Sequence, residues 1–147
     1  LAAAGRFTVV SINARLTVAA LDAIWGSTVE HRRRYGKEAI SMTVTRPNVA
    51  VPDDAARAHV KTLNLRDDAA ATSVVVLDGG GFWAAGLRGW LAGMSLVSPR
   101  ASRAAATIKE GLEKLAHHLD ADTGTAATLE PWIERFRSRH LDGQSVR

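Results

Sequence analysis

The sequence predicts an α/β fold: a single layered domain with a four-to-five-stranded, mostly parallel sheet, surrounding helices and an extra C-terminal helix. Segments rich in β-branched residues alternate with helical segments along the chain, as they do in parallel sheets. The third β-rich segment, residues 71–78, contains the continuous apolar run Val74–Leu77, which is typical of a central strand covered on both faces. A length of 147 residues suffices for one domain with its own core.

Four strands are expected where β-branched runs are bounded by turn residues. They cover residues 6–13, 39–45, 71–78 and, as the weakest of the four, 101–106. The first helix is expected from a cap at Thr17 to about Tyr35, because three arginines and Gly36 form a typical helix end.

Three further helices follow the later strands. The second is expected from Asp53, whose carboxylate suits a helix start, to about Leu65, and the third covers residues 82–96. Thr107 and Glu110 match a capping box, in which Glu110 reaches back, at the start of the fourth helix.

The chain divides into a domain of residues 1–120 and a segment of residues 121–147 that holds a linker and an amphipathic helix. Trp132, Ile133 and Phe136 form an apolar stripe on that helix. We expect the stripe to pack on the domain or at a dimer interface.

Composition excludes several classes of function. The chain has no cysteine, which excludes disulfides and thiolate chemistry. Its net charge is +4, but the basic residues are dispersed and aromatic residues make up only 5%, so no nucleic-acid partner is expected. No apolar stretch reaches the roughly 18 residues of a membrane span, so we expect no membrane association and a cytoplasmic protein.

No metal site, cofactor or catalytic set is expected either. The five histidines form no pair at the i, i+4 spacing of a helical metal site, and His59, one turn into the second helix, is expected to have no neighbouring acid. No G-x-S-x-G elbow occurs, and no serine has an evident general base. These absences favour a protein that is not an enzyme.

The glycines between the third strand and third helix allow two interpretations. Gly79, Gly81 and Ala84 formally match a dinucleotide-binding fingerprint, but they lie in the third βα turn and no acidic residue follows before Glu110. The alternative is a tight turn that uses glycine for its backbone freedom.

Three more glycines, Gly86, Gly89 and Gly93, lie inside the third helix, where each costs roughly 1 kcal/mol relative to alanine. We expect close approach of a strand or another helix to compensate for this. The opposite face is strongly apolar, so either face is a candidate for burial and the other for a partner surface.

The element order and apolar pattern of residues 6–119 resemble STAS domains, the fold of bacterial anti-sigma-factor antagonists. The segments RFTVVSIN, AISMTVTRPNVAVPDDAARAHV, SVVVLDGGGFWAAGLRGWLAGMSL and AAATIKEGLEKL carry this resemblance. It implies a further strand at the start of the fold, missing or truncated before Leu1. In such antagonists a kinase phosphorylates a serine of an Asp-Ser-Ser-Gly-like motif and thereby switches partner binding. The matching residues here look like Asp53, Asp54, Ala55 and Ala56, which include no serine.

The resemblance and the lack of catalytic residues predict a non-catalytic, regulatory protein-interaction module. Its partner surface is expected at the loop and helix start after the second strand, at Asn48, Asp53, Asp54 and Arg57. Two alternatives stay open. One is a small anionic ligand or nucleotide bound at Gly79, Gly80 and Gly81, and the other is a self-assembling structural subunit that uses Trp132, Ile133 and Phe136.

Overall fold

A computed structural model describes residues 1–47, 49–66, 72–97 and 102–141 of the chain. The strands of this part form one sheet, in the same order as they occur along the chain. They are β1 (Ala2–Ala4), β2 (Phe7–Ile12), β3 (Ile40–Thr45), β4 (Thr72–Leu77) and β5 (Arg103–Ala105). β1 runs antiparallel to β2, and the other neighbouring pairs are parallel. The expected α/β fold with a mostly parallel sheet is therefore confirmed.

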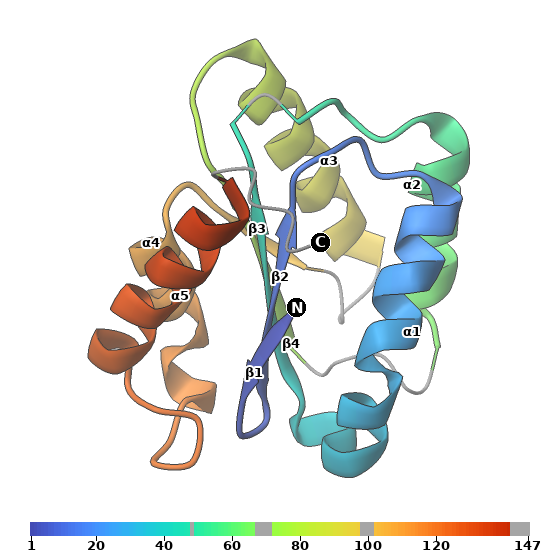
Figure 1. Cartoon of the computed structure of the whole chain (residues 1–147). Helices are drawn as coiled ribbons and strands as arrows, with labels where there is room; N and C mark the ends of the chain where they lie inside the picture. Colours follow the sequence, from blue (N-terminus) through green and yellow to red (C-terminus); the bar gives the residue numbers. More distant parts are fainter. Residues whose placement is uncertain (48, 67–71, 98–101, 142–147) are drawn as a thin grey trace.

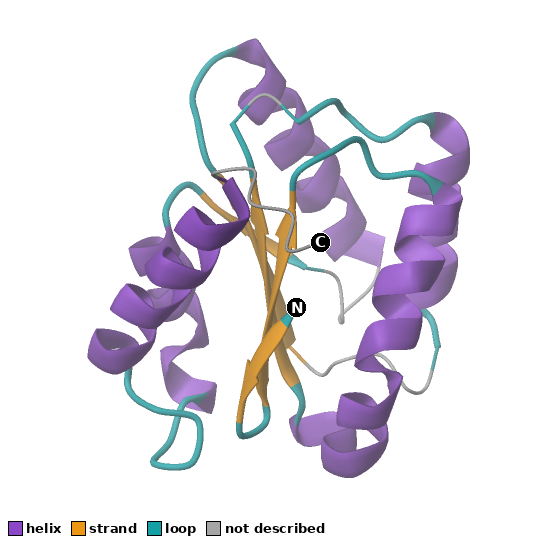
Figure 2. Cartoon of the chain, viewed as in Figure 1, coloured by secondary structure: helices purple, strands orange, loops and turns teal. Residues whose placement is uncertain are grey.

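Helices cover both faces of the sheet, which Figures 1 and 2 show edge-on. One face carries α1 (Val18–Tyr35), α2 (Asp54–Asn64) and α3 (Phe82–Val97), and the other carries α4 (Ile108–Leu115) and α5 (Ala126–Leu141). Sequential parallel strands joined by right-handed connections place all their connecting helices on the same face. Short 3-10 helices, Gly36–Glu38 and Ala116–His118, follow α1 and α4.

The main core lies between the sheet and the pair α4 and α5. Alternate residues of β2, β3 and β4 point into it, and α4 adds three buried aliphatic residues. The strand residues are Phe7, Val9, Ile40, Met42, Val44, Val74 and Val76, and the helix residues are Ile108, Leu112 and Leu115. This face is wholly aliphatic and aromatic, as expected for a well-packed interior.

The structure confirms the expected helix starts. Thr17 caps α1 by accepting a hydrogen bond from the Ala20 amide at 3.2 Å, and Asp53 caps α2 through the Ala56 amide at 2.8 Å. Thr107 caps α4 through the Glu110 amide at 3.1 Å. The Glu110 carboxylate reaches back to the amide of Ala106.

The hairpin strand β1 was not expected. Its three residues are alanines, which have low strand propensity, so no local pattern indicates a strand there. The turn that follows uses Gly5 at φ 53°, and a Cβ there would lie 2.6 Å from the Asp122 carbonyl oxygen. A tertiary contact therefore fixes this end of the sheet.

The apolar stripe of α5 faces its own domain. Ile133 is fully buried in the main core together with Leu129, and Trp132 and Phe136 are partly buried against it. The Trp132 ring lies 6.4 Å from the Phe7 ring, centroid to centroid. α5 thus completes the core over β2, and self-association through this stripe stays a prediction.

Candidate functional site

The predicted partner residues after β3 have structural roles of their own. Asp53 is the cap of α2, and the exposed carboxylate of Asp54 pairs with Arg57 one turn further along the same helix. Asn48 lies outside the described residues. Both Asp54 and Arg57 reach solvent. However, helix capping by Asp53 and the ion pair of Asp54 with Arg57 already explain why these two positions are acidic.

The backbone of the glycine turn after β4 is that of a tight turn, as the second interpretation predicts. Gly79 and Gly81 adopt φ values of 112° and 91°, which other residues rarely adopt. Gly79 lies beside the loop after β3, since a Cβ there would be 3.8 Å from the Cα of Pro47. The strand order reverses nowhere among the parallel strands, so the sheet lacks the crevice in which nucleotides bind in doubly wound folds. An anion at Gly79, Gly80 and Gly81 stays a prediction.

The helix after this turn, α3, buries only one of its two apolar faces. Ala84, Leu87, Leu91 and Met94 are buried on one side of the helix, where Leu87 and Leu91 pack with residues of β4 and β5. Arg88 is the only charged residue between Phe82 and Val97. A helix that is apolar all round is normally buried all round.

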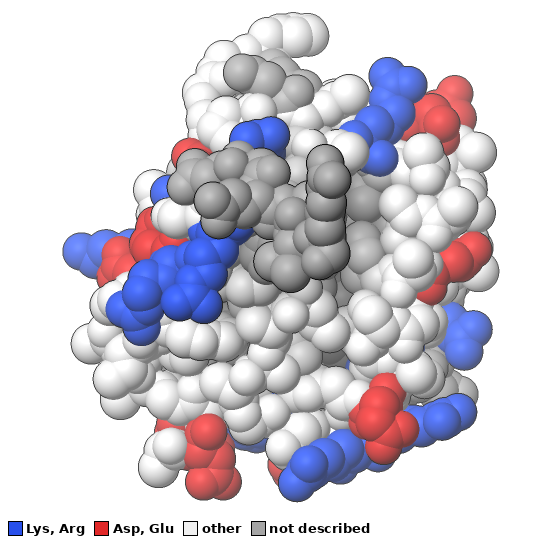
Figure 3. All heavy atoms as spheres, viewed as in Figure 1, with Lys and Arg blue, Asp and Glu red and all other residues white. Residues whose placement is uncertain are grey.

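The opposite face of α3 is exposed, and we refer to it as the α3 stripe. Its members lie within about 60° of one line along the helix. They are Phe82, Ala85, Gly86, Gly89, Gly93 and Leu96, all exposed. Phe82 and Leu96 are 96% and 88% exposed, at the two ends of the stripe. Figure 3 shows no charged side chain at the tip of the molecule where α3 begins in Figure 1.

Of the two faces left open as candidates for burial, the one with the three helical glycines is not packed within the described part of the chain. A Cβ at Gly86, Gly89 or Gly93 would have no atom of the described chain within 4 Å. The residues that pack are the larger ones on the other face. Nothing in the described part of the chain therefore compensates for the glycines.

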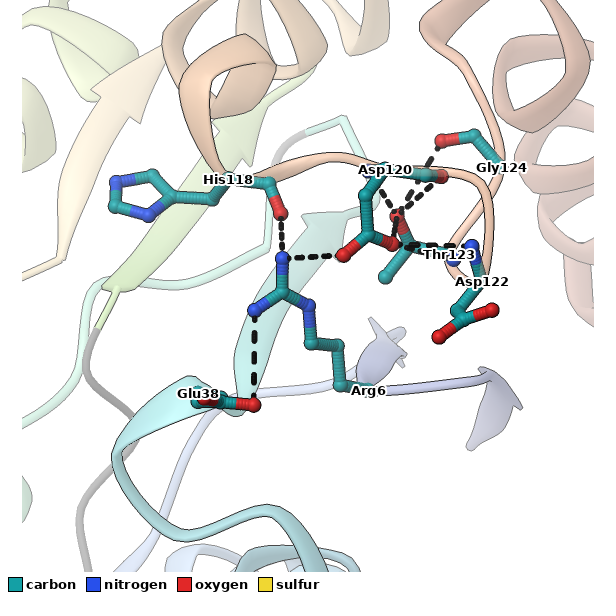
Figure 4. A network of polar contacts seen from close by, with 7 residues as sticks. All are labelled: Arg6, Glu38, His118, Asp120, Asp122, Thr123 and Gly124. Atoms are coloured by element: carbon teal, nitrogen blue, oxygen red, sulfur yellow. Dashed lines mark hydrogen bonds and ion pairs between the residues drawn. The ribbon is translucent and has the colours of Figure 1, made fainter.

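A polar network joins the turn before β2 to the segment after α4, at the end of the sheet where the parallel strands begin (Figure 4). The Arg6 guanidinium donates to the Asp120 carboxylate and to the His118 carbonyl oxygen, each at 2.7 Å, and lies 3.9 Å from the Glu38 carboxylate. Asp120 also accepts from the amides of Asp122 and Thr123 at 3.1 Å.

The chemistry of this network is structural. The hydrogen bond from the Thr123 backbone amide, together with the charge of Arg6, holds the pKa of Asp120 below its ordinary value. A carboxylate kept ionised by a turn and an arginine is poorly suited to proton transfer at neutral pH. The network fastens the turn before β2 to the segment that leads into α5.

Two more carboxylates pair with groups distant in the sequence. Asp78, at the end of β4, pairs with Arg137 of α5, which also contacts Glu134 at 2.7 Å. Asp22 of α1 lies 2.6 Å from Nε2 of His59, so the expectation that His59 has no neighbouring acid is wrong, because the fold brings α1 beside α2. Among the described residues, neither pair belongs to a group of three ligands that could hold a metal ion.

No group of three or more histidines and carboxylates in the described ranges could hold a metal ion. Likewise, no helix of the described residues has the length and apolar character needed to cross a membrane. No family model matches the chain, and no curated protein or solved structure does so. The α3 stripe, with two exposed large apolar residues and three unpacked glycines, is the surface feature on which a functional proposal can be based.

Proposed function

We propose that the chain is a non-catalytic interaction domain and that the α3 stripe is its binding surface, covered by the α3 stripe of a second copy. The observation that carries this proposal is an exposed helix face of six small or apolar residues, three of them glycines that nothing in the described chain packs against. Glycines in such a face allow a second helix to approach closely, as small residues do where helices pack tightly.

The spacing of the stripe favours a twofold partner. Phe82 and Leu96 each lie seven residues from Gly89, on opposite sides of it. An antiparallel pair of helices with its twofold axis at Gly89 brings Phe82 of one copy towards Leu96 of the other. The same surface is used by both copies, as in most dimers.

Charge is compatible with this pairing, because the stripe holds no charged residue and Arg88 lies to one side of it. A single helix pair gives an interface at the small end of those that are stable in solution. We expect a dissociation constant of about 10 μM, which corresponds to roughly 7 kcal/mol.

We also propose that this interaction domain is STAS-like and regulatory. The alternation of strands and helices from β2 to α4 supports it, as does the sharp start of α2 at the position of the expected motif. The absence of a serine between Asp53 and Ala56 means that partner binding here is not switched by phosphorylation at that site.

Sedimentation velocity of the whole chain tests the proposal. The wild type is expected to shift from monomer to dimer between about 1 and 100 μM, and Gly89→Gln is expected to stay monomeric. Gly26→Gln is the matched control, because Gly26 is also exposed, helical and without neighbours within 4 Å of a Cβ. A monomeric wild type throughout this range, or an equal effect of the two substitutions, contradicts the proposal.

A further inference from the structure

The two faces of the sheet differ sharply in polarity. Opposite the aliphatic core, the face under α1 and α2 carries a transverse row of hydroxyl groups. Thr8 pairs in register with Ser41, and Ser41 with Ser73. Ser102 continues the row, since its hydroxyl lies 2.7 Å from that of Ser73. Four strands or strand ends thus contribute one hydroxyl each to a single line.

The helices leave a cavity above this row. Its volume is about 160 Å³, and α1 supplies part of its wall through Trp25, Thr28, His31 and Arg32. Voids of this size are few in a protein interior. Another protein with an engineered apolar cavity of about 150 Å³ binds benzene there.

A second cavity of about 150 Å³ adjoins the first. The two have wall residues in common, among them Thr43, Ile24 and Val60. Beyond these the second cavity is lined mainly by apolar residues of α3 and of the loop after β3, including Leu91 and Met94. The combined space is polar at one end and apolar at the other.

The polar end offers hydrogen-bond donors. Nε1 of Trp25 is buried and has no hydrogen-bond partner among the described residues. A buried indole N–H usually has an acceptor. The Arg32 side chain, only 6% exposed as a residue, stacks on the Trp25 ring at 3.9 Å and donates to the Trp25 carbonyl oxygen at 3.0 Å. No acidic residue occurs among the described residues that line either cavity.

We propose that this space binds a small monocarboxylic acid with an apolar body, of the size of benzoate or hexanoate. The carboxylate lies at the polar end, where the Ser41 hydroxyl, one hydroxyl of the Ser73–Ser102 pair and the Trp25 indole N–H donate to it. Thr8 lines this end without donating to the ligand, because its hydroxyl already donates to the Ile40 carbonyl oxygen at 3.2 Å. The apolar body lies between Leu91 and Met94 and the sheet. This site is separate from the α3 stripe, so either proposal can fail without the other.

The test is a titration of the ¹⁵N-labelled chain with benzoate and with hexanoate, followed by the indole N–H signals, which are assigned with single Trp→Phe variants. The signals of Trp25 and Trp90, which line the two cavities, are expected to shift and saturate at acid concentrations up to about 10 mM. Trp132 lies on the other face of the sheet and its signal is expected to stay in place.

Two controls identify the chemistry and the site. Benzyl alcohol and hexanol, which lack the charge, are expected to bind at least about tenfold more weakly. Ser41→Val is expected to weaken benzoate binding about tenfold, whereas Ser11→Val, the same change on the opposite face of the sheet, is expected to leave it unchanged. No saturable shift, equal binding of the alcohols, or equal effects of the two serine substitutions overturns the proposal.

Discussion

Replacing Gly89 by alanine tests the open face of α3 through protein stability. A Cβ at Gly89 meets no described atom within 4 Å, so the methyl group introduces no clash. Alanine is favoured over glycine inside a helix by about 1 kcal/mol. The free energy of unfolding of the monomer is therefore expected to rise by about 1 kcal/mol, and Tm by about 2–4 °C for a chain of this size.

Urea denaturation followed by circular dichroism measures this effect, at a chain concentration of about 1 μM, where the proposed dimer is dissociated. Gly111→Ala is the matched contrast. A Cβ there would lie 3.0 Å from Cε of Met42 and 3.1 Å from Cγ2 of Val76, so this methyl group crowds the core and is expected to lower stability or leave it unchanged. Loss of stability in Gly89→Ala at this concentration would show that α3 packs through its glycine face, and would refute the reasoning.

Three other tests address the packing and the polar contacts. Asp53→Ala removes the cap of α2 and is expected to destabilise the chain by about 1 kcal/mol, whereas Asp54→Ala, at an exposed position, leaves the urea midpoint nearly unchanged; equal effects would contradict the capping role. Ile133→Ala is expected to reduce the free energy of unfolding by about 2–5 kcal/mol, and a loss below about 1 kcal/mol would show that α5 does not belong to the core. The pKa of Asp120 is lowered in the folded chain, so its contribution to stability is complete above the ordinary value of 3.8 and is lost as the pH falls through the folded value. The difference in urea midpoint between wild type and Asp120→Asn is therefore expected to be largest at neutral pH and to shrink as the pH falls below 3.8, and a difference that does not change with pH would refute the assignment.

The elements with strong local signals were predictable from the sequence. Thr17 and Gly36 mark the two ends of α1, and Asp53 marks the start of α2, because capping depends on residues close in the chain. β1 was not predictable in the same way. Its three alanines form a strand because β2 offers a free edge and Gly5 allows a tight approach to Asp122, and both partners are tertiary.

The candidate site was predictable only in part. The sequence of α3 shows two apolar faces. The face with Leu87 and Leu91 packs on the sheet because these side chains fit against Leu77 of β4, a tertiary contact that the sequence of the helix alone does not indicate. The hydroxyl row had a visible signal that was missed. In β3, Ser41, Thr43 and Thr45 alternate with Ile40, Met42 and Val44, and this alternation indicates one polar and one apolar face.

Cysteine cross-linking tests the central claim, the pairing of two α3 stripes, most directly. The chain has no cysteine of its own, so Gly89→Cys introduces a single thiol at the proposed twofold axis. Under mild oxidation at about 50 μM, Gly89→Cys is expected to form a disulfide-linked dimer much faster than Gly26→Cys, because only the first pair of thiols is held close together. Equal rates of cross-linking for the two variants would contradict the account.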